Sequence, residues 1–124
     1  MSYKYWNPNP NHQNSNGDCV VRAISKIMNR SWDQVYIDLC IQGYIQKDWG
    51  NSNSVWDSYL REHGFVRKVV PNICPGCYTV KDFCRDNPIG EYILAMGDHV
   101  VAVVDGNYYD SYDSGNEAVI FYYV

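Results

Sequence analysis

Three kinds of residue in this chain could together carry out nucleophilic catalysis on an acyl group: a cysteine, a histidine and a carboxylate. Cys19 lies between the turn-forming run QNSNGD and a segment whose apolar residues recur at helical spacing. Unpaired backbone N–H groups and the positive end of the helix dipole stabilise a thiolate in the first turn of a helix. The pattern therefore predicts Cys19 as a nucleophile. The alternative is a small apolar residue that begins a helix.

A thiolate nucleophile needs a base or an imidazolium partner, and the chain has three histidines. His12 lies in a loop rich in proline and asparagine, and His63 lies on a polar stretch near the end of an expected helix. His99 opens the β-branched run HVVAVV after the turn residues MGD, so a strand would hold it rigidly at the edge of a cleft. We predict His99 as the base, against the plainer interpretation of a structural histidine.

A third group should orient the imidazole, and the chain offers Asp110 and Asp113 after His99. The Asp-Gly pair at 105–106 predicts a tight hairpin. With a two-residue turn, His99 lies opposite Tyr112 and shares a sheet face with Asp110. A three-residue loop would shift the register by one and place Asp113 opposite His99. We favour Asp110, and Asp113 remains the alternative.

Gln13 lies six residues before Cys19. Its side-chain amide could donate to an oxyanion, together with the backbone N–H at the start of the helix. The plainer interpretation is an ordinary polar residue in a loop.

These segments together resemble the papain-like cysteine peptidase superfamily. That superfamily has a glutamine six residues before its nucleophile, which QNSNGDC matches, and the Q-x4-D-C form is similar to the bacteriocin-processing branch. GDHVVAVVDG is similar to the histidine strand, and DSY at 110–112 is similar to the Asn-Ser-Trp segment that carries the third catalytic residue. The resemblance covers residues 13–28 and 97–115.

The chain departs from the family in two respects. It is much shorter than papain, and valines at positions 20 and 21 replace the usual glycine and tryptophan after the nucleophile. These differences concern the substrate pockets more than the catalytic geometry.

The resemblance implies a papain-like fold, with N-terminal helices packed on a C-terminal antiparallel sheet and the active site between them. It also implies a cysteine peptidase that hydrolyses a peptide or isopeptide bond through a thioester. In that mechanism Cys19 attacks, His99 accepts and returns the proton, and Asp110 orients His99. Gln13 and the backbone N–H of Cys19 would stabilise the oxyanion.

Two alternatives stay open at this point. One is an acyl or amide transferase that uses the same triad. The other is a non-catalytic interaction module that keeps the fold.

Composition limits the classes of partner. A chain of 124 residues with 46% hydrophobic residues predicts a single domain over 1–124. The net charge of −4 argues against nucleic acid as a partner. Neither a long apolar run nor a secretory signal is present, which predicts no membrane partner and a cytoplasmic protein acting on a peptide or protein. The sequence does not indicate an oligomeric state.

Helical spacing and cap residues precede strand-like segments, which indicates an α+β fold with a predominantly antiparallel sheet. The run at 5–17 reads as a loop, and Asp18 is a candidate N-cap. On the first helix, Arg22 is expected on the polar face. Helices are expected at about 19–28, from a cap at Ser31 to near Gly43, within 51–64, and at about 80–84, and strands at 65–70, 91–96, 99–104, 108–113 and 119–124.

The remaining four cysteines need a separate account. An odd total of five, without a secretory signal, predicts free thiols rather than a disulfide framework. CPGC at Cys74–Cys77 could be a plain turn, a redox pair, or half a zinc site completed by Cys40 or Cys84. We favour the turn and predict no metal or cofactor. Cys40 is expected in the core, and Cys84 is expected to be partly buried.

Overall fold

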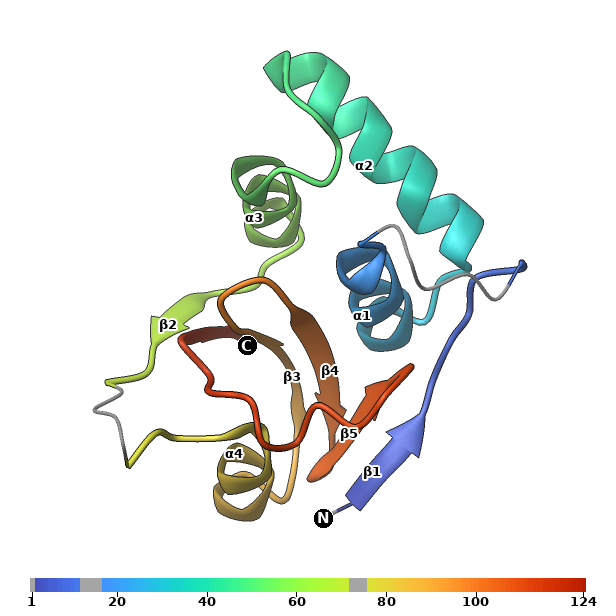
Figure 1. Cartoon of the computed structure of the whole chain (residues 1–124). Coiled ribbons are helices and arrows are strands. Elements are labelled where there is room, and N and C mark those ends of the chain that lie inside the picture. The colour runs from blue at the N-terminus through green and yellow to red at the C-terminus, as the bar shows by residue number, and fades with distance from the viewer. Residues whose placement is uncertain (1, 12–16, 72–75) are drawn as a thin grey trace.

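A computed structural model describes residues 2–11, 17–71 and 76–124, and its elements form a mixed α+β fold, as predicted (Figure 1). Along the chain the elements are β1 (Ser2–Tyr5), α1 (Cys19–Met28), α2 (Trp32–Gln46), α3 (Asn53–Glu62), β2 (Arg67–Val69), α4 (Val80–Asp86), β3 (Glu91–Ala95), β4 (Val100–Val104), β5 (Asn107–Asp110) and β6 (Phe121–Tyr123). Within these ranges no helix has the length and apolar character needed to cross a bilayer.

The strands form one sheet in the order β1-β5-β4-β3-β6-β2. Among the described strands, β1 and β5 are the parallel pair and the other neighbours are antiparallel, so the expected antiparallel character is confirmed. The strand at β1 corrects the sequence analysis, which assigned none there. Three of its four residues are exposed, so pairing with β5 defines it rather than a buried apolar pattern.

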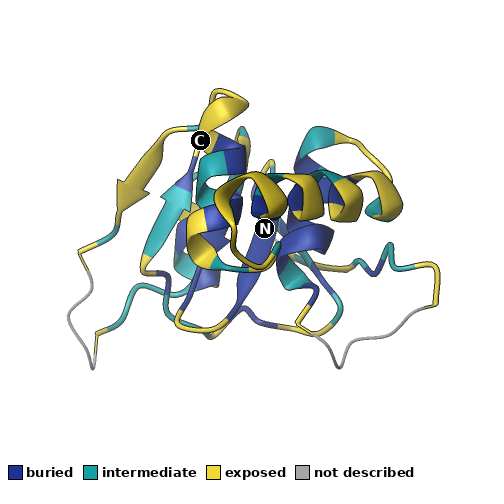
Figure 2. Ribbon diagram, turned by 90° about the horizontal axis from the view of Figure 1, so that it is seen from above, coloured by how far each residue is buried: buried dark blue, intermediate teal, exposed yellow. Residues whose placement is uncertain are grey.

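Both faces of the sheet are covered. Ile93 and Ala95 of β3 pack with α1, α2 and α3, whereas Leu94 and Met96 pack on the other face with α4. The runs at 91–96 and 99–104 are therefore nearly continuous in apolar residues, as in other strands buried on both sides. In Figure 2 the exposed residues lie mainly on the outer helix faces and the connecting loops, and the buried ones on the central elements.

The first helix has the predicted bounds, and the second is longer than expected. The Ser31 side chain accepts from the backbone N–H of Gln34 at 3.1 Å, as its cap role predicts. The helix continues past Gly43 to Gln46 instead of ending there. A side chain at Gly43 would meet the carbonyl oxygen of Asp48 at 2.6 Å, so this glycine lets the following loop approach α2 rather than ending the helix.

The last predicted hairpin strand also differs from expectation. It spans Asn107–Asp110 instead of 108–113, and a turn follows it. The side chains of Asp110 and Asp113 accept from the backbone N–H groups of Ser111 and Gly115, at 2.8 and 3.0 Å. Such side-chain bonds compete with strand pairing and favour a turn.

The cysteines correct three expectations. Cys40 is exposed rather than in the core, because α2 buries its Val35, Leu39 and Gly43 side instead. Cys84 is fully buried. Cys77 is disulfide-bonded, so the expectation of free thiols throughout is wrong at this position. Cys74 lies outside the described residues. Within the described ranges, no three His, Cys, Asp or Glu residues are grouped so as to hold a metal ion.

Candidate active site

Cys19 is the first residue of α1, as predicted, and carries a half-buried free thiol. It lines a cavity of about 250 Å³ between the start of α1 and the loop that joins β3 to β4. Gly17, two residues earlier, has φ +67° and open space around its α-carbon. The backbone before the thiol therefore turns without a side chain that would obstruct access to it.

His99 lies directly before β4 and lines the same cavity, with only 7% of its surface exposed. Its Nε2 lies 2.5 Å from Oδ2 of Asp110. Interaction with Cys19 also raises the pKa of the ring. Because Nε2 is used by Asp110, Nδ1 is the ring nitrogen that remains for the thiol. The ring of Tyr112 packs against the imidazole with centroids 5.0 Å apart.

The register of the hairpin places Asp110, not Asp113, at His99. Val104 pairs with Asn107, so the turn at 105–106 has two residues, both with positive φ. Asp113 instead accepts from the hydroxyl of Tyr108 at 2.5 Å. The hairpin geometry thus places Asp110, and not Asp113, beside the imidazole, a choice that the sequence alone left undecided.

Hydrogen bonds fix Asp110 in a buried position where only 2% of its surface is exposed. In addition to His99, its carboxylate accepts from the Ser114 hydroxyl at 2.6 Å and the Ser111 N–H at 2.8 Å. Its backbone carbonyl accepts from the N–H of Trp6 at 2.7 Å. A carboxylate with this many donors has little freedom to turn away from the imidazole.

The electrostatics favour a charged pair. Burial lowers the pKa of His99, but hydrogen bonds and charge interactions with Asp110 and Cys19 outweigh burial and raise this pKa to about 9. Burial raises the pKa of Asp110, and its hydrogen bonds to His99 and Ser114 more than offset this, so its pKa lies below the usual range. Near neutral pH the imidazole is therefore protonated and the carboxylate ionised.

Arg22 is a component of the site that the sequence analysis placed wrongly. It was expected on the polar face of α1, but only 5% of its surface is exposed. Its guanidinium donates to Asp18 and, at 3.3 Å, to Oδ1 of Asp110. Two buried carboxylates supply the counter-charge that a buried arginine needs. The Asp18–Arg22 spacing of four residues was the available signal in the sequence.

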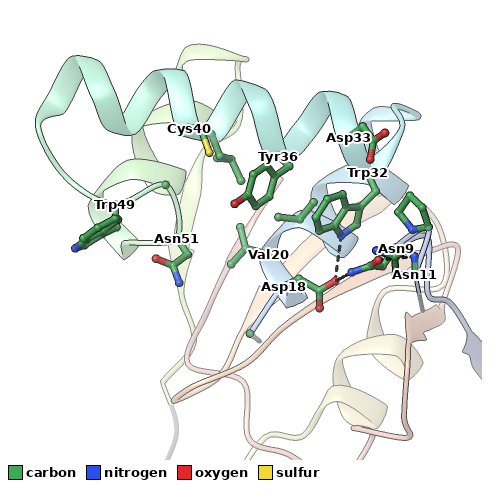
Figure 3. Close-up of a pocket in the computed structure, with 15 residues that line it drawn as sticks. Asn9, Asn11, Asp18, Val20, Trp32, Asp33, Tyr36, Cys40, Trp49 and Asn51 are labelled. Carbon is green, nitrogen blue, oxygen red and sulfur yellow. Dashed lines mark hydrogen bonds between the residues drawn. The ribbon is translucent and has the colours of Figure 1, made fainter. Parts of the chain in front are cut away.

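Asp18 has a different role from the one predicted. Its side chain makes no cap hydrogen bond to α1, although its carbonyl accepts from the N–H of Arg22 at 2.9 Å. The carboxylate instead accepts from Arg22, from the indole N–H of Trp32 at 3.0 Å and from the amide of Asn9 at 3.2 Å (Figure 3). The network that reaches Asp110 therefore extends across α1 to α2.

A second, larger cavity of about 810 Å³ adjoins this network, between α1, α2 and the loop after α2 (Figure 3). Gly17, Val20 and Asn51 line both cavities. The larger cavity thus adjoins the cleft that holds Cys19 and His99, and the sequence analysis did not predict it.

Of the four predicted site residues, the structure brings three together. Cys19 and His99 line one cleft, and His99 is hydrogen-bonded to Asp110. Gln13 lies outside the described residues, so its role stays a prediction. No protein-family model, curated protein or solved structure matches this chain, and its function has to be inferred from the site itself.

Proposed function

We propose that this chain is a cysteine peptidase that hydrolyses a peptide or isopeptide bond through a thioester intermediate. One observation carries the proposal: Cys19, at the start of a helix, and His99 line the same cleft, and Nε2 of His99 is hydrogen-bonded to buried Asp110. A nucleophile and a base that line one cleft, with the base held by an orienting carboxylate, are the arrangement that covalent acyl transfer uses.

The reaction begins when the Sγ of ionised Cys19 attacks the carbonyl carbon of the scissile bond. Protonated His99 then gives its Nδ1 proton to the leaving amine, the C–N bond breaks, and a thioester remains. Water attacks the thioester while His99 takes one of its protons. The C–S bond breaks, the acid product leaves, and the proton on His99 restores the charged pair.

The developing oxyanion lies near the first turn of α1, where the backbone N–H of Cys19 has no partner within the helix. The resemblance to papain-like peptidases adds the side-chain amide of Gln13 as a second donor. Asp110 keeps the imidazole in one orientation throughout.

The same proposal includes the papain-like fold and a cytoplasmic site of action. The fold is supported by a helix that begins at the nucleophile and packs on the sheet that carries His99 and Asp110. Three cysteines with free thiols, Cys19, Cys40 and Cys84, fit a cytoplasmic site, whereas the disulfide at Cys77 is the exception to that pattern. The substrate is a peptide or protein.

Alkylation by iodoacetamide at pH 6, followed by mass spectrometry, tests the proposal. Exposed Cys40 is an internal reference thiol in the same sample. We expect Cys19 to react at least about tenfold faster than Cys40, because Cys19 lies at the start of a helix beside an imidazolium partner and Cys40 has neither. His99→Ala should remove this advantage. His63→Ala, at a histidine whose Nδ1 contacts the Tyr59 carbonyl, should keep it.

Equal reaction of Cys19 and Cys40 at pH 6 would contradict the proposal and favour the non-catalytic interaction module. A transferase would pass this test, since it uses the same triad. Product analysis with a competing amine separates it from a hydrolase, because a transferase forms the new amide.

A further inference from the structure

The cavity of about 810 Å³ adjoins the site, and the mechanism does not use it. Its volume lies within the range of ligand sites, roughly 300–1,000 Å³, and exceeds what one side chain fills. It meets the catalytic cleft at Gly17, Val20 and Asn51, the first two of which flank Cys19 closely in sequence. A chain bound at Cys19 could therefore continue into it.

Aromatic rings form one wall of this cavity. Trp32 and Tyr36 stack with centroids 5.0 Å apart, and the indole N–H of Trp32 is fixed by Asp18. In Figure 3 both rings extend from α2 above Val20 of α1 and Asp18, which directly precedes α1, with Trp49 at the far end. Trp49 is 80% exposed and Tyr36 is 49% exposed. Large aromatic rings left open to water in one concave surface mark a binding site more often than a structural one.

The charged groups of the cavity restrict its ligand. Asp18 and Asp33 line it, and the part of its lining that the structure describes contains no lysine or arginine. The Asp18 charge is balanced by Arg22, whereas Asp33 is exposed at the rim. An acidic ligand would therefore be repelled, and a neutral or basic one would not.

The need for His99 to protonate the leaving amine indicates which part of a substrate enters the larger cavity. His99 must reach the leaving amine to protonate it, so the leaving part of a substrate has to lie in the smaller cavity, which His99 lines. Neither His99 nor Cys19 lines the larger cavity, which meets the smaller one at Gly17, Val20 and Asn51. The acyl part of the substrate is the part left to enter it.

We propose that the larger cavity binds the acyl-side segment of a peptide substrate, at least two residues long and not acidic, with a bulky aromatic or aliphatic side chain against Trp32, Tyr36 and Trp49. This inference rests on the proposed peptidase function. It makes extended polypeptides, rather than small amides, the substrates of Cys19. The amide of Asn51, at the junction of the two cavities, is placed to bind the main chain of that segment.

Peptidyl acyloxymethyl ketones of glycine and alanine, with one tryptophan at the first, second or third residue from the reactive group, test the inference. The rate of adduct formation at Cys19, followed by mass spectrometry, is compared with that of all-alanine and glutamate-containing probes. We expect tryptophan in at least one position to increase the rate by about tenfold or more over alanine, and glutamate there to decrease it.

Trp49→Ala and Tyr36→Ala should each remove most of the tryptophan preference. Tyr44→Ala is the matched control, because Tyr44 is an exposed aromatic residue of α2 outside the cavity lining. Iodoacetamide is used in parallel on every variant. If Cys19 reacts with it in the His99-dependent way but no tryptophan position exceeds alanine, the inference is wrong and the peptidase proposal stands. If Cys19 lacks His99-dependent reactivity, the peptidase proposal itself fails.

Discussion

Replacing Asp110 by asparagine removes the charge that most directly holds the proton on His99. The pKa of His99 is raised from 6.5 to about 9 against the effect of burial, and this difference corresponds to roughly 3 kcal/mol in favour of the imidazolium. In Asp110→Asn the burial remains while the negative charge and its hydrogen bond are lost. We expect the pKa of His99 to fall by more than one unit, which is more than about tenfold in proton affinity.

The same substitution changes how stability depends on pH. Because the folded-state pKa of His99 is raised, its contribution is fully present below pH 6.5 and is lost as the pH rises through about 9. The free energy of unfolding of the wild type should therefore decrease between these values, by up to about 3 kcal/mol. In Asp110→Asn most of this decrease should disappear.

An NMR titration of the His99 Cε1 proton measures the pKa directly, and urea unfolding between pH 6 and pH 10 measures the stability. Asp113→Asn is the matched control, because Asp113 contacts Tyr108 and Gly115 instead of the imidazole. An unchanged pKa of His99 in Asp110→Asn, or an equal fall in both variants, would refute the electrostatic account of the site.

Three further outcomes follow from the contacts. Arg22→Met should lower the free energy of unfolding by about 3–5 kcal/mol in urea titrations, because it leaves Asp18 buried without its cation and removes one of the two cations at Asp110. A loss below about 1 kcal/mol would mean that water reaches these carboxylates. Ser114→Ala should cost about 2 kcal/mol in the same assay, through one hydrogen bond to a charged group. Thr79→Ala should cost about 1 kcal/mol through the capping box of α4 and leave Cys19 alkylation unchanged. Slower alkylation in this variant would show coupling across the sheet.

The positions of Cys19, His99 and Asp110 were predictable because local rules determine them. Turn residues before an apolar helical pattern place Cys19 at the start of α1, and the two-residue turn at 105–106 sets which aspartate meets His99. These rules involve residues that lie close together in the chain, so a single sequence is enough to apply them.

Arg22 and Cys40 could not be placed by local rules. The burial of Arg22 depends on Asp110, 88 residues away in sequence, and the polar character of arginine alone predicts exposure. The apolar residues of α2 occur on more than one face, so their pattern does not show which side packs on the core and leaves Cys40 exposed. The cavity beside α2 was also missed, because the sequence pattern does not show which side of α2 faces away from the core.

The parallel pairing of β1 with β5 has a consequence for protein synthesis. Tyr5 pairs with Asp110, the residue that contacts His99, so the strand made first is completed by one made more than a hundred residues later. At usual translation rates Cys19 leaves the ribosome on the order of ten seconds before Asp110 follows. During that interval the nascent chain exposes a thiol that has neither its base nor its orienting carboxylate. The proposed triad can therefore form only after the chain has been translated as far as Asp110.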